Sequence, residues 1–477
     1  MARLLSFGLL ALLASPFLGF LYVLFLRSPP ALPDVDVKAW WGPKELQAKQ
    51  DTSIKPFKMV QDLKERLKNH RKWTPPLENI GFQYGFNSKQ LDSWVTYWTE
   101  KYNFQEREKF FNQYPQFKTN IQGLNIHFIR VKPEVKGQAC VCYCRNKLII
   151  LIMFQVPAGV EVVPMLFMHG WPGSVREFYE ALPLLTAVSK DRNFAIEAIV
   201  PSLPGYGFSD VSALWFVYRS MAVVMRNLMH RLGFKKFYVQ GGDWGSLIGS
   251  DLATLFPNVI LGYHTNMGAV QSMAATLLNL FGSMFPSFVV ESRLAERMYP
   301  LSKTLGYLIE ETGYMHIQAT KPDTIGVGVS DSPVGLLAYI LEKFSTWTKP
   351  EYKTRLDGGL AQHWTKDQLL DNLMCYWATN SFTTSVRMYS ETFNKRYYGL
   401  QLGEIPTSVP TWIIQAKNEL TFQSARILRF KYTNLLHANP IEDGGHFLAF
   451  ELPKVFSEDV LNAVAAFRKF YSQKTEL

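Results

Sequence analysis

An aspartate stands at the centre of a short segment that predicts an exposed, reactive side chain. The run from Lys236 to Gln240 is mostly apolar and leads into two glycines, Gly241 and Gly242. A helix of apolar and small residues begins near Trp244. Strand, glycine turn and helix in this order form a sharp elbow that pushes one side chain upward. Here that side chain is the carboxylate of Asp243.

The carboxylate determines which reactions this position supports. An aspartate with an ordinary pKa of about 3.9 is already anionic at neutral pH, so it attacks without the help of a base. A carboxylate suits displacement at a saturated electrophilic carbon, which leaves an alkyl ester on the enzyme. Epoxides and alkyl halides are electrophiles of this kind. A purely structural alternative is that Asp243 caps the helix that follows it.

Two further residues complete a candidate hydrolytic set. Glu419 follows the apolar run from Trp412 to Ala416, and His446 follows two glycines shortly before a C-terminal helix. The order nucleophile, acid, histidine is the one found in α/β-hydrolases. We expect His446 to activate a water that hydrolyses the ester, and Glu419 to orient the imidazole. Asp443 is the alternative acid, but it lies in the same loop as the histidine.

An oxyanion hole is predicted from two backbone amides. The apolar run from Val162 to Met168 reads as a buried parallel strand, and the glycine-bearing loop 169–174 follows it. This fold takes one donor from such a loop and the other from the residue after the nucleophile. The backbones of Trp171 and Trp244 are therefore the expected donors.

The same pattern predicts the fold class. Apolar strands alternate with helices, as in an α/β-hydrolase, but a long aromatic and helical stretch separates the strand at 259–266 from the strand at 411–415. An insertion of this length indicates a mostly helical cap over the strand ends, where open α/β sheets bind ligands. We place the α/β-hydrolase core in two segments, 158–269 and 401–477, with the cap at 270–400 between them.

Composition and charge give no indication of a nucleic-acid partner, a metal site or a disulfide framework. The chain has 477 residues, 47% of them hydrophobic, with a net charge of +10. The only modest basic run, Lys64 to Lys72, reads as a solvated helix face, so no nucleic-acid partner is expected. Cys140, Cys142 and Cys144 alternate without a histidine cluster, and Cys375 is distant. This spacing predicts neither a metal site nor a disulfide framework, as in a body facing the cytosol.

The N-terminus predicts a membrane anchor at 1–27. Leu4 to Leu26 is apolar apart from two serines and lies between Arg3 and Arg27. It is long enough to cross a hydrocarbon core of about 30 Å. A cleaved signal peptide is the alternative, although its apolar part usually spans only about 7–15 residues. The balanced flanking charges do not set the orientation.

Residues 28–136 read as an N-terminal arm followed by the first strands. Helices are expected at Phe57 to His70 and at Ser88 to Lys101, the second starting at an N-cap serine. The stretch 137–157, with three cysteines and the apolar burst Leu148 to Phe154, is atypical. It is interpreted as a variable insertion or a gene-model artefact, with a buried extra strand as the alternative.

Five motifs together resemble the microsomal epoxide hydrolase family. They are HGWPGS at 169–174, GYGFS at 205–209, GGDWGS at 241–246, GYMHIQ at 313–318 and GGHF at 444–447. The resemblance covers about 35–477. It departs from the family at 137–157 and at Asp210 to Ser220, which is unusually apolar. It implies hydrolysis of lipophilic epoxides to diols without a cofactor, on the endoplasmic reticulum membrane, as in detoxification and aromatic hydrocarbon catabolism.

The resemblance also implies two residues that open the epoxide ring. They are Tyr314 in GYMHIQ and Tyr389 in the segment Arg387 to Glu391. A phenol with a pKa of about 10 stays protonated at neutral pH and can donate to the developing alkoxide. The chain holds 22 tyrosines, and spacing alone does not select these two.

Two other classes of function stay open on the sequence alone. A haloalkane dehalogenase shares the aspartate and histidine but needs N–H donors for the halide in place of phenols. An inactive hydrolase fold could serve as a binding protein, although the set Asp243, Glu419 and His446 is complete. The preferred epoxide, whether xenobiotic, fatty-acid or terpenoid hormone, and the oligomeric state are left undetermined.

Overall fold

The computed structural model describes most of the chain after the N-terminal region. Described are residues 70–133, 138–144, 147–153, 159–212, 218–393 and 402–475, with 27–33, 35–42, 55–56, 63–68 and a few single positions before them. The predicted anchor, Leu4 to Leu26, lies outside the described residues except for four single positions. In the described part, no single helix is long and apolar enough to cross a membrane, and one helix pair qualifies only together, with a bend of 117°.

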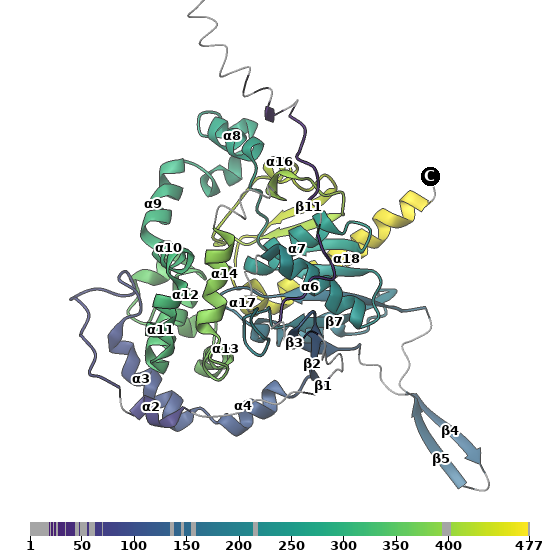
Figure 1. The fold of residues 1–477 in the computed structure, drawn as a ribbon, viewed down its shortest axis with the longest axis horizontal. Helices are drawn as coiled ribbons and strands as arrows, with labels where there is room; N and C mark the ends of the chain where they lie inside the picture. The colour runs from purple at the N-terminus through teal and green to yellow at the C-terminus, as the bar shows by residue number, and fades with distance from the viewer. Residues whose placement is uncertain are drawn as a thin grey trace, which may run out of the picture.

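A nine-stranded sheet forms the centre of the molecule (Figure 1). Its strand order is β1-β2-β3-β7-β6-β8-β9-β10-β11. Strands β1, β2, β3 and β7 pair in antiparallel fashion, and the strands from β7 to β11 are parallel. The strand bounds are β1 Lys55–Pro56, β2 Gln116–Ile121, β3 Leu124–Val131, β6 Glu161–Met168, β7 Phe194–Pro201, β8 Phe237–Gly241, β9 Ile260–Thr265, β10 Thr411–Gln415 and β11 Leu435–Pro440.

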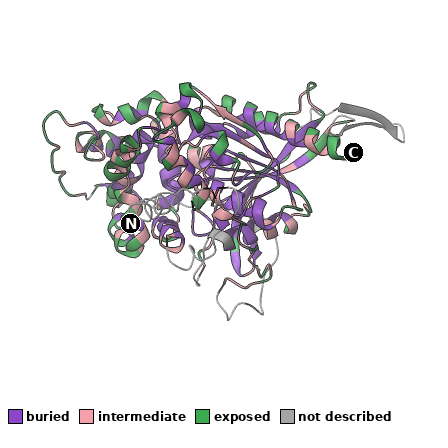
Figure 2. Ribbon diagram, turned by 90° about the horizontal axis from the view of Figure 1, so that it is seen from above, coloured by how far each residue is buried: buried purple, intermediate pink, exposed green. Residues whose placement is uncertain are grey.

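The parallel strands are covered on both faces, which explains their apolar sequences. Every residue of β7 and β8 is buried, and Figure 2 shows the sheet as the buried centre of the protein. One core cluster joins the sheet to α6 and α7, and a second joins it to α5 and α18. The core helices are η5 Val175–Phe178, α5 Leu182–Thr186, α6 Tyr218–Arg231, α7 Asp243–Leu255, η10 Leu402–Glu404, α16 Ala425–Leu428, α17 Leu448–Glu451 and α18 Pro453–Thr475. The α/β-hydrolase class predicted from the sequence is confirmed.

The chain between β9 and β10 is helical where it is described. Its helices are α8 Met273–Gly282, η6 Pro286–Phe288, η7 Ser292–Arg297, α9 Leu301–Glu311, α10 Gly313–Thr320, α11 Pro322–Ser330, α12 Pro333–Thr346, η8 Pro350–Thr354, η9 Leu360–Gln362, α13 Lys366–Trp377 and α14 Phe382–Thr392. Local sequence sets their starts: Ser332 caps α12 ahead of Pro333, and Thr365 forms a capping box with Gln368 at α13. The cap boundaries 270–400 and the other predicted domain limits stay predictions.

The N-terminal arm adds α2 Lys64–Lys68, η3 Ser88–Gln90, α3 Leu91–Thr96, η4 Tyr97–Lys101 and α4 Phe104–Phe111. The single helix expected at Ser88 to Lys101 is wrong in detail, because it consists of a 3-10, an α and a π segment. Its N-cap is Asn87, whose side chain accepts the Lys89 N–H, and not Ser88. Most of Phe57 to His70 beyond α2, and residues 213–217 of the atypical loop, lie outside the described residues.

A buried carboxylate joins the arm, the core and the cap. Asp371 in α13 accepts bonds from Arg107 of α4 at 2.8 Å and from Arg176 of η5 at 3.0 Å. The Tyr102 hydroxyl donates to the same carboxylate at 3.0 Å. Because three regions of the chain share one buried ion network, the arm is tied to the loop that carries the predicted oxyanion hole.

The atypical stretch 137–157 does not add a strand to the main sheet. Its strands β4 Gln138–Cys144 and β5 Lys147–Met153 pair with each other in an antiparallel hairpin. They form a separate two-stranded sheet, which stands away from the nine-stranded one in Figure 1. The alternative of a buried extra strand in the main sheet is therefore wrong, because β4 and β5 form their own two-stranded sheet and β6 pairs directly with β7 and β8.

Candidate active site

The turn between β8 and α7 holds Asp243 in a strained conformation. Its φ is +48°, in the left-handed region that non-glycine residues rarely adopt. Small neighbours make the turn possible: a Cβ on Gly245 would lie 2.2 Å from the Met168 carbonyl oxygen, and one on Gly170 would lie 2.1 Å from Asp243 Oδ1. The elbow predicted from the sequence therefore presents the carboxylate, and α7 begins at Asp243 itself.

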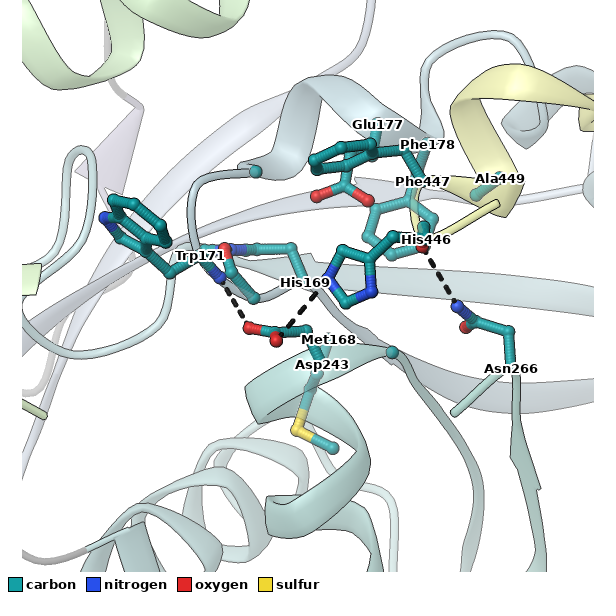
Figure 3. Close-up of a pocket in the computed structure, with 13 residues that line it drawn as sticks. Met168, His169, Trp171, Glu177, Phe178, Asp243, Asn266, His446, Phe447 and Ala449 are labelled. Carbon is teal, nitrogen blue, oxygen red and sulfur yellow. Dashed lines mark hydrogen bonds and ion pairs between the residues drawn. The ribbon is translucent and has the colours of Figure 1, made fainter. Parts of the chain in front are cut away.

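Two groups from other elements contact the carboxylate (Figure 3). The Trp171 backbone N–H donates to Asp243 Oδ1 at 2.7 Å. The His446 Nε2 atom lies 3.4 Å from Asp243 Oδ2. Trp244 follows Asp243 in the first turn of α7, where backbone N–H groups have no acceptor within the helix. The structure thus brings one predicted oxyanion donor into contact with the carboxylate and places the other beside it.

His446 is paired with Glu419. The imidazole Nδ1 lies 2.7 Å from Glu419 Oε1, which also accepts the Leu420 backbone N–H at 2.7 Å. The His446 side chain is 2% exposed and that of Glu419 3%. Asp443, the alternative acid, is exposed. Glu419 follows β10 and His446 follows β11, so the carboxyl ends of parallel strands bring the two residues together.

Two carboxylates make the imidazole more basic. Burial opposes the charged form of His446, but Glu419 and Asp243 outweigh burial and hold the pKa of His446 well above its ordinary value. The two carboxylates therefore favour the protonated form of the imidazole. Loss of the charge on Asp243 removes one of the interactions that raise this pKa.

The tyrosines implied by the resemblance lie over the site on the cap side. Tyr314 comes from α10 and stacks on Trp171, with ring centroids 5.3 Å apart, and Tyr389 comes from α14. The two phenol rings lie 5.9 Å apart in an edge-to-face arrangement. Burial, with the Asp243 charge also contributing, raises the pKa of both phenols well above the ordinary value. Both therefore stay protonated at neutral pH and can donate a proton.

A narrow cavity lies beside the carboxylate and the imidazole. Its volume is about 10 Å³, near the lower limit for one water molecule. Asp243, His446, Glu177, Asn266 and Gly173 are among the residues that line it. Tyr314 and Tyr389 do not line it, so the small cavity and the tyrosine pair are separate features of the site.

Sequence reasoning missed two glutamates beside the site, the half-buried Glu177 and the buried Glu451. Glu177 of η5 lines the cavity, and Glu451 accepts the N–H groups of Gly445 at 2.8 Å and Phe447 at 2.9 Å, the two neighbours of His446. Burial raises the pKa of each glutamate to about 8. No local pattern marks them, because a glutamate in a helical turn is usually exposed. In the described residues, no three His, Cys, Asp or Glu side chains gather as a metal-ligand group.

The raised pKa of Glu177 predicts that the stability of the folded protein depends on pH. Between the ordinary pKa of 4.5 and about 8, the folded protein keeps a proton on Glu177 that the unfolded chain has lost. The free energy of unfolding therefore falls as pH rises through this window, by at most about 1.4 kcal/mol per pH unit for one group. Urea unfolding of the wild type and of Glu177→Gln at pH 5.5 and 8.5 measures how much the free energy of unfolding decreases between the two pH values. The decrease should be smaller in the variant, which lacks the carboxyl group. An equal decrease in both proteins would contradict the expectation.

The fold and the site together define an α/β-hydrolase with an aspartate on the nucleophile elbow. A family model described as "alpha/beta hydrolase fold" matches residues 163–453, and one described as "Epoxide hydrolase N terminus" matches residues 52–178. Juvenile hormone epoxide hydrolase of Bombyx mori is 59% identical over 464 residues, 96% of each chain. Epoxide hydrolase 1 of Sus scrofa is 39% identical over 465 residues, 94% of this chain and 97% of that relative.

A solved structure gives the same result. The crystal structure of the Bombyx mori juvenile hormone epoxide hydrolase matches with a TM-score of 0.86 and 58% identity, covering 92% of this chain and 100% of that chain. The chain belongs to the microsomal epoxide hydrolase family, as the sequence motifs predicted. It is an epoxide hydrolase that acts on a small-molecule epoxide, and these relatives favour that activity over a dehalogenase or an inactive binding protein.

Proposed function

We propose that this epoxide hydrolase converts juvenile hormone to its diol by a two-step reaction at Asp243. The contact of Asp243 with both Trp171 and His446 carries the proposed mechanism. The substrate follows from the Bombyx mori relative, which is named for juvenile hormone and is 59% identical over nearly the whole chain. The aromatic side chains of the buried Trp171 and Tyr389 and the half-buried Tyr314 around the carboxylate suit a lipophilic epoxide.

In the first step, Asp243 opens the ring. Its Oδ2 atom forms a bond to one epoxide carbon, and the carbon–oxygen bond of the ring breaks. Tyr314 or Tyr389 donates its hydroxyl proton to the leaving alkoxide, since both phenols are protonated at neutral pH. The Asp243 Oδ1 atom, held by the Trp171 amide, becomes the carbonyl oxygen of the ester.

In the second step, water hydrolyses the ester. Esterification removes the charge of Asp243, which lowers the pKa of His446, and the imidazolium proton passes to the tyrosinate, which becomes a neutral phenol again. The neutral imidazole then takes a proton from a water in the adjacent cavity, and the hydroxide attacks the Asp243 carbonyl carbon. The amides of Trp171 and Trp244 stabilise the oxyanion, and Glu419 stabilises the imidazolium. His446 protonates the leaving alkoxide, which yields the diol, and then takes the proton of the Asp243 carboxylic acid, so that the carboxylate and the imidazolium are both restored.

Substrate competition tests the choice of epoxide. We expect kcat/KM for juvenile hormone to exceed that for styrene oxide by at least about tenfold, because apolar contacts along a longer substrate add selectivity. Diol formation from both substrates by the purified protein is the measurement. Equal values for the two epoxides would leave the hydrolase activity intact but contradict the proposed substrate, and would favour a general detoxifying role.

Removing the cap phenols tests ring opening. A single Tyr314→Phe or Tyr389→Phe change should slow alkylation of Asp243 modestly, because the other phenol still donates. The double variant should slow it about 10²–10⁴-fold, the usual contribution of general acid catalysis. Stopped-flow measurement of ester formation shows the effect. Tyr339→Phe is the matched control, because this ring lies 6.1 Å from Trp171 but has no proposed donor role.

Membrane attachment is included in the proposal. Leu4 to Leu26 would hold the protein in the endoplasmic reticulum membrane by a single span, with the catalytic body in the cytosol. The length and apolar character of this stretch support attachment, and the family resemblance supports the compartment. Flotation of the full-length protein with phospholipid vesicles, resistant to high salt, is the expected result. Recovery of the protein in the unbound fraction would contradict attachment.

A further inference from the structure

Exposed apolar side chains concentrate on one edge of the cap. Eight large hydrophobic residues between positions 273 and 309 are exposed, and Met284 and Ile309 reach 73% and 75%. We call these residues the apolar cap edge: Met273, Leu280, Met284, Phe285, Phe288, Leu305, Leu308 and Ile309. Soluble proteins rarely expose contiguous apolar patches of this kind unless the patch meets a partner or a membrane.

The edge is an ordered surface. In α8, Ala275, Leu278 and Gly282 are buried against the protein, which turns the opposite face outward. The Phe281 ring packs against those of Phe285 and Phe288, at 5.2 and 6.1 Å between centroids. Figure 1 shows α8 and α9 at the outer end of the cap. The exposed side chains of α8 and of the turn that follows it therefore belong to an ordered helical surface.

The N-terminal chain reaches this edge. Arg27, the first residue after the apolar stretch Leu4 to Leu26, lies with its Nη1 atom 3.7 Å from Met273 Sδ and 3.6 Å from Glu404 Oε2. Met273 is the first residue of α8. A ten-residue helix such as α8 is about 15 Å long. A membrane span that ends at Arg27 would therefore join the body at the start of α8, about one such helix length from Met284 and Phe288.

Charges of both signs lie near the edge, and several of them form opposite pairs. Glu291 lies 3.0 Å from Arg293, and Glu310 of α9 lies 2.9 Å from Lys353. Local pairing leaves little net charge to attract anionic head groups. The chemistry therefore suits insertion of apolar side chains into the boundary between head groups and acyl chains, with little dependence on lipid charge.

We propose that the apolar cap edge inserts into the lipid bilayer beside the N-terminal span, so that the body has two contacts with the membrane. The inference rests on the proposed membrane attachment. It goes beyond that attachment by assigning a lipid-binding surface on the cap and an orientation of the body. Because the N-terminal span and the apolar cap edge would both be held by the bilayer, the cap would face the membrane. A lipophilic epoxide would enter the site from that membrane.

Depth-dependent fluorescence tests the surface on the full-length protein. An NBD label is placed at Met284→Cys and, as a control, at Leu77→Cys, in a background where Cys140, Cys142 and Cys144 are changed to serine; Cys375 is buried. Leu77 is 61% exposed and lies in the segment between α2 and α3, two helices at the lower left of Figure 1, whereas α8 lies near the top. The proteins are reconstituted into phosphatidylcholine vesicles, with and without phosphatidylserine. Styrene oxide turnover verifies that each labelled protein is folded.

Insertion predicts a clear difference between the labels. Nitroxide groups on lipids should quench NBD at 284 about threefold more than NBD at 77, because interfacial elements lie about 5–10 Å into the bilayer boundary. Protein that floats with vesicles but shows equal iodide quenching at both sites would overturn the inference and keep the membrane attachment. Protein that fails to float would overturn both. Protection from iodide without lipid quenching, or protection that grows with protein-to-lipid ratio, would indicate the N-terminal segment or a second copy instead.

Discussion

Asp243→Asn lowers kcat for epoxide hydrolysis by about 10⁴-fold or more, the scale seen when a covalent nucleophile is removed from a hydrolase. The amide oxygen of asparagine can still accept the Trp171 N–H, so the geometry of the elbow is kept. A neutral amide lacks the anionic oxygen that attacks the ring carbon. The expected loss therefore reports the chemistry of the side chain and not a collapse of the site. Steady-state diol formation is the measurement.

Two controls make this result specific. Asp443→Asn changes an exposed acid near His446 and should keep kcat within about twofold of wild type. In wild type, a single turnover in ¹⁸O-labelled water should place label in the Asp243 carboxylate, while the first diol carries an enzyme oxygen. Label that appears directly in the first diol would mean that water attacks the epoxide and would contradict the nucleophile assignment.

His446→Gln should separate the two steps of the reaction. Attack by Asp243 needs no base, so the epoxide still alkylates the protein. Hydrolysis of the ester loses its general base, which contributes about 10²–10⁴-fold in such reactions. The expected outcome is a stable adduct of about one substrate mass per protein, located on the peptide that contains Asp243 by intact-protein and peptide mass spectrometry. Diol turnover should nearly cease.

The partner residue provides a graded comparison. Glu419→Gln keeps an acceptor for His446 Nδ1 but removes the charge that stabilises the imidazolium, so it should slow ester hydrolysis less than His446→Gln. The double variant Asp243→Asn with His446→Gln should form no adduct, which shows that labelling occurs at Asp243. An unmodified His446→Gln protein that still makes diol at the wild-type rate would exclude this histidine as the base.

The local features of the site could be read from sequence because each depends on neighbours in the chain. Small residues around Asp243 predicted the elbow, since a side chain at Gly245 would collide with the Met168 carbonyl. Continuous apolar runs predicted the strands β6, β8, β9 and β10 and with them the α/β-hydrolase class. The family and the epoxide hydrolase activity were predicted from motifs that are short and contiguous, and the comparisons confirm both.

Features that depend on long-range packing could not be read in this way. The stretch 137–157 carries strand-like sequence, but only pairing shows that it forms its own hairpin. Glu177 and Glu451 look like surface glutamates, and their raised pKa values come from burial by distant elements. The bonds of Asp371 to Arg107 and Arg176 join segments of the chain that are about two hundred residues or more apart.

What the sequence alone predicted is therefore the type of reaction: an anionic nucleophile at an elbow, followed by an acid and a histidine in the order that this fold requires. The tertiary structure decided which groups surround that nucleophile. Packing of α10 and α14 over Trp171 places two of 22 tyrosines beside Asp243 and leaves one edge of the cap apolar and exposed. The physical reason is that burial and proximity arise from contacts between distant segments, which no local pattern encodes.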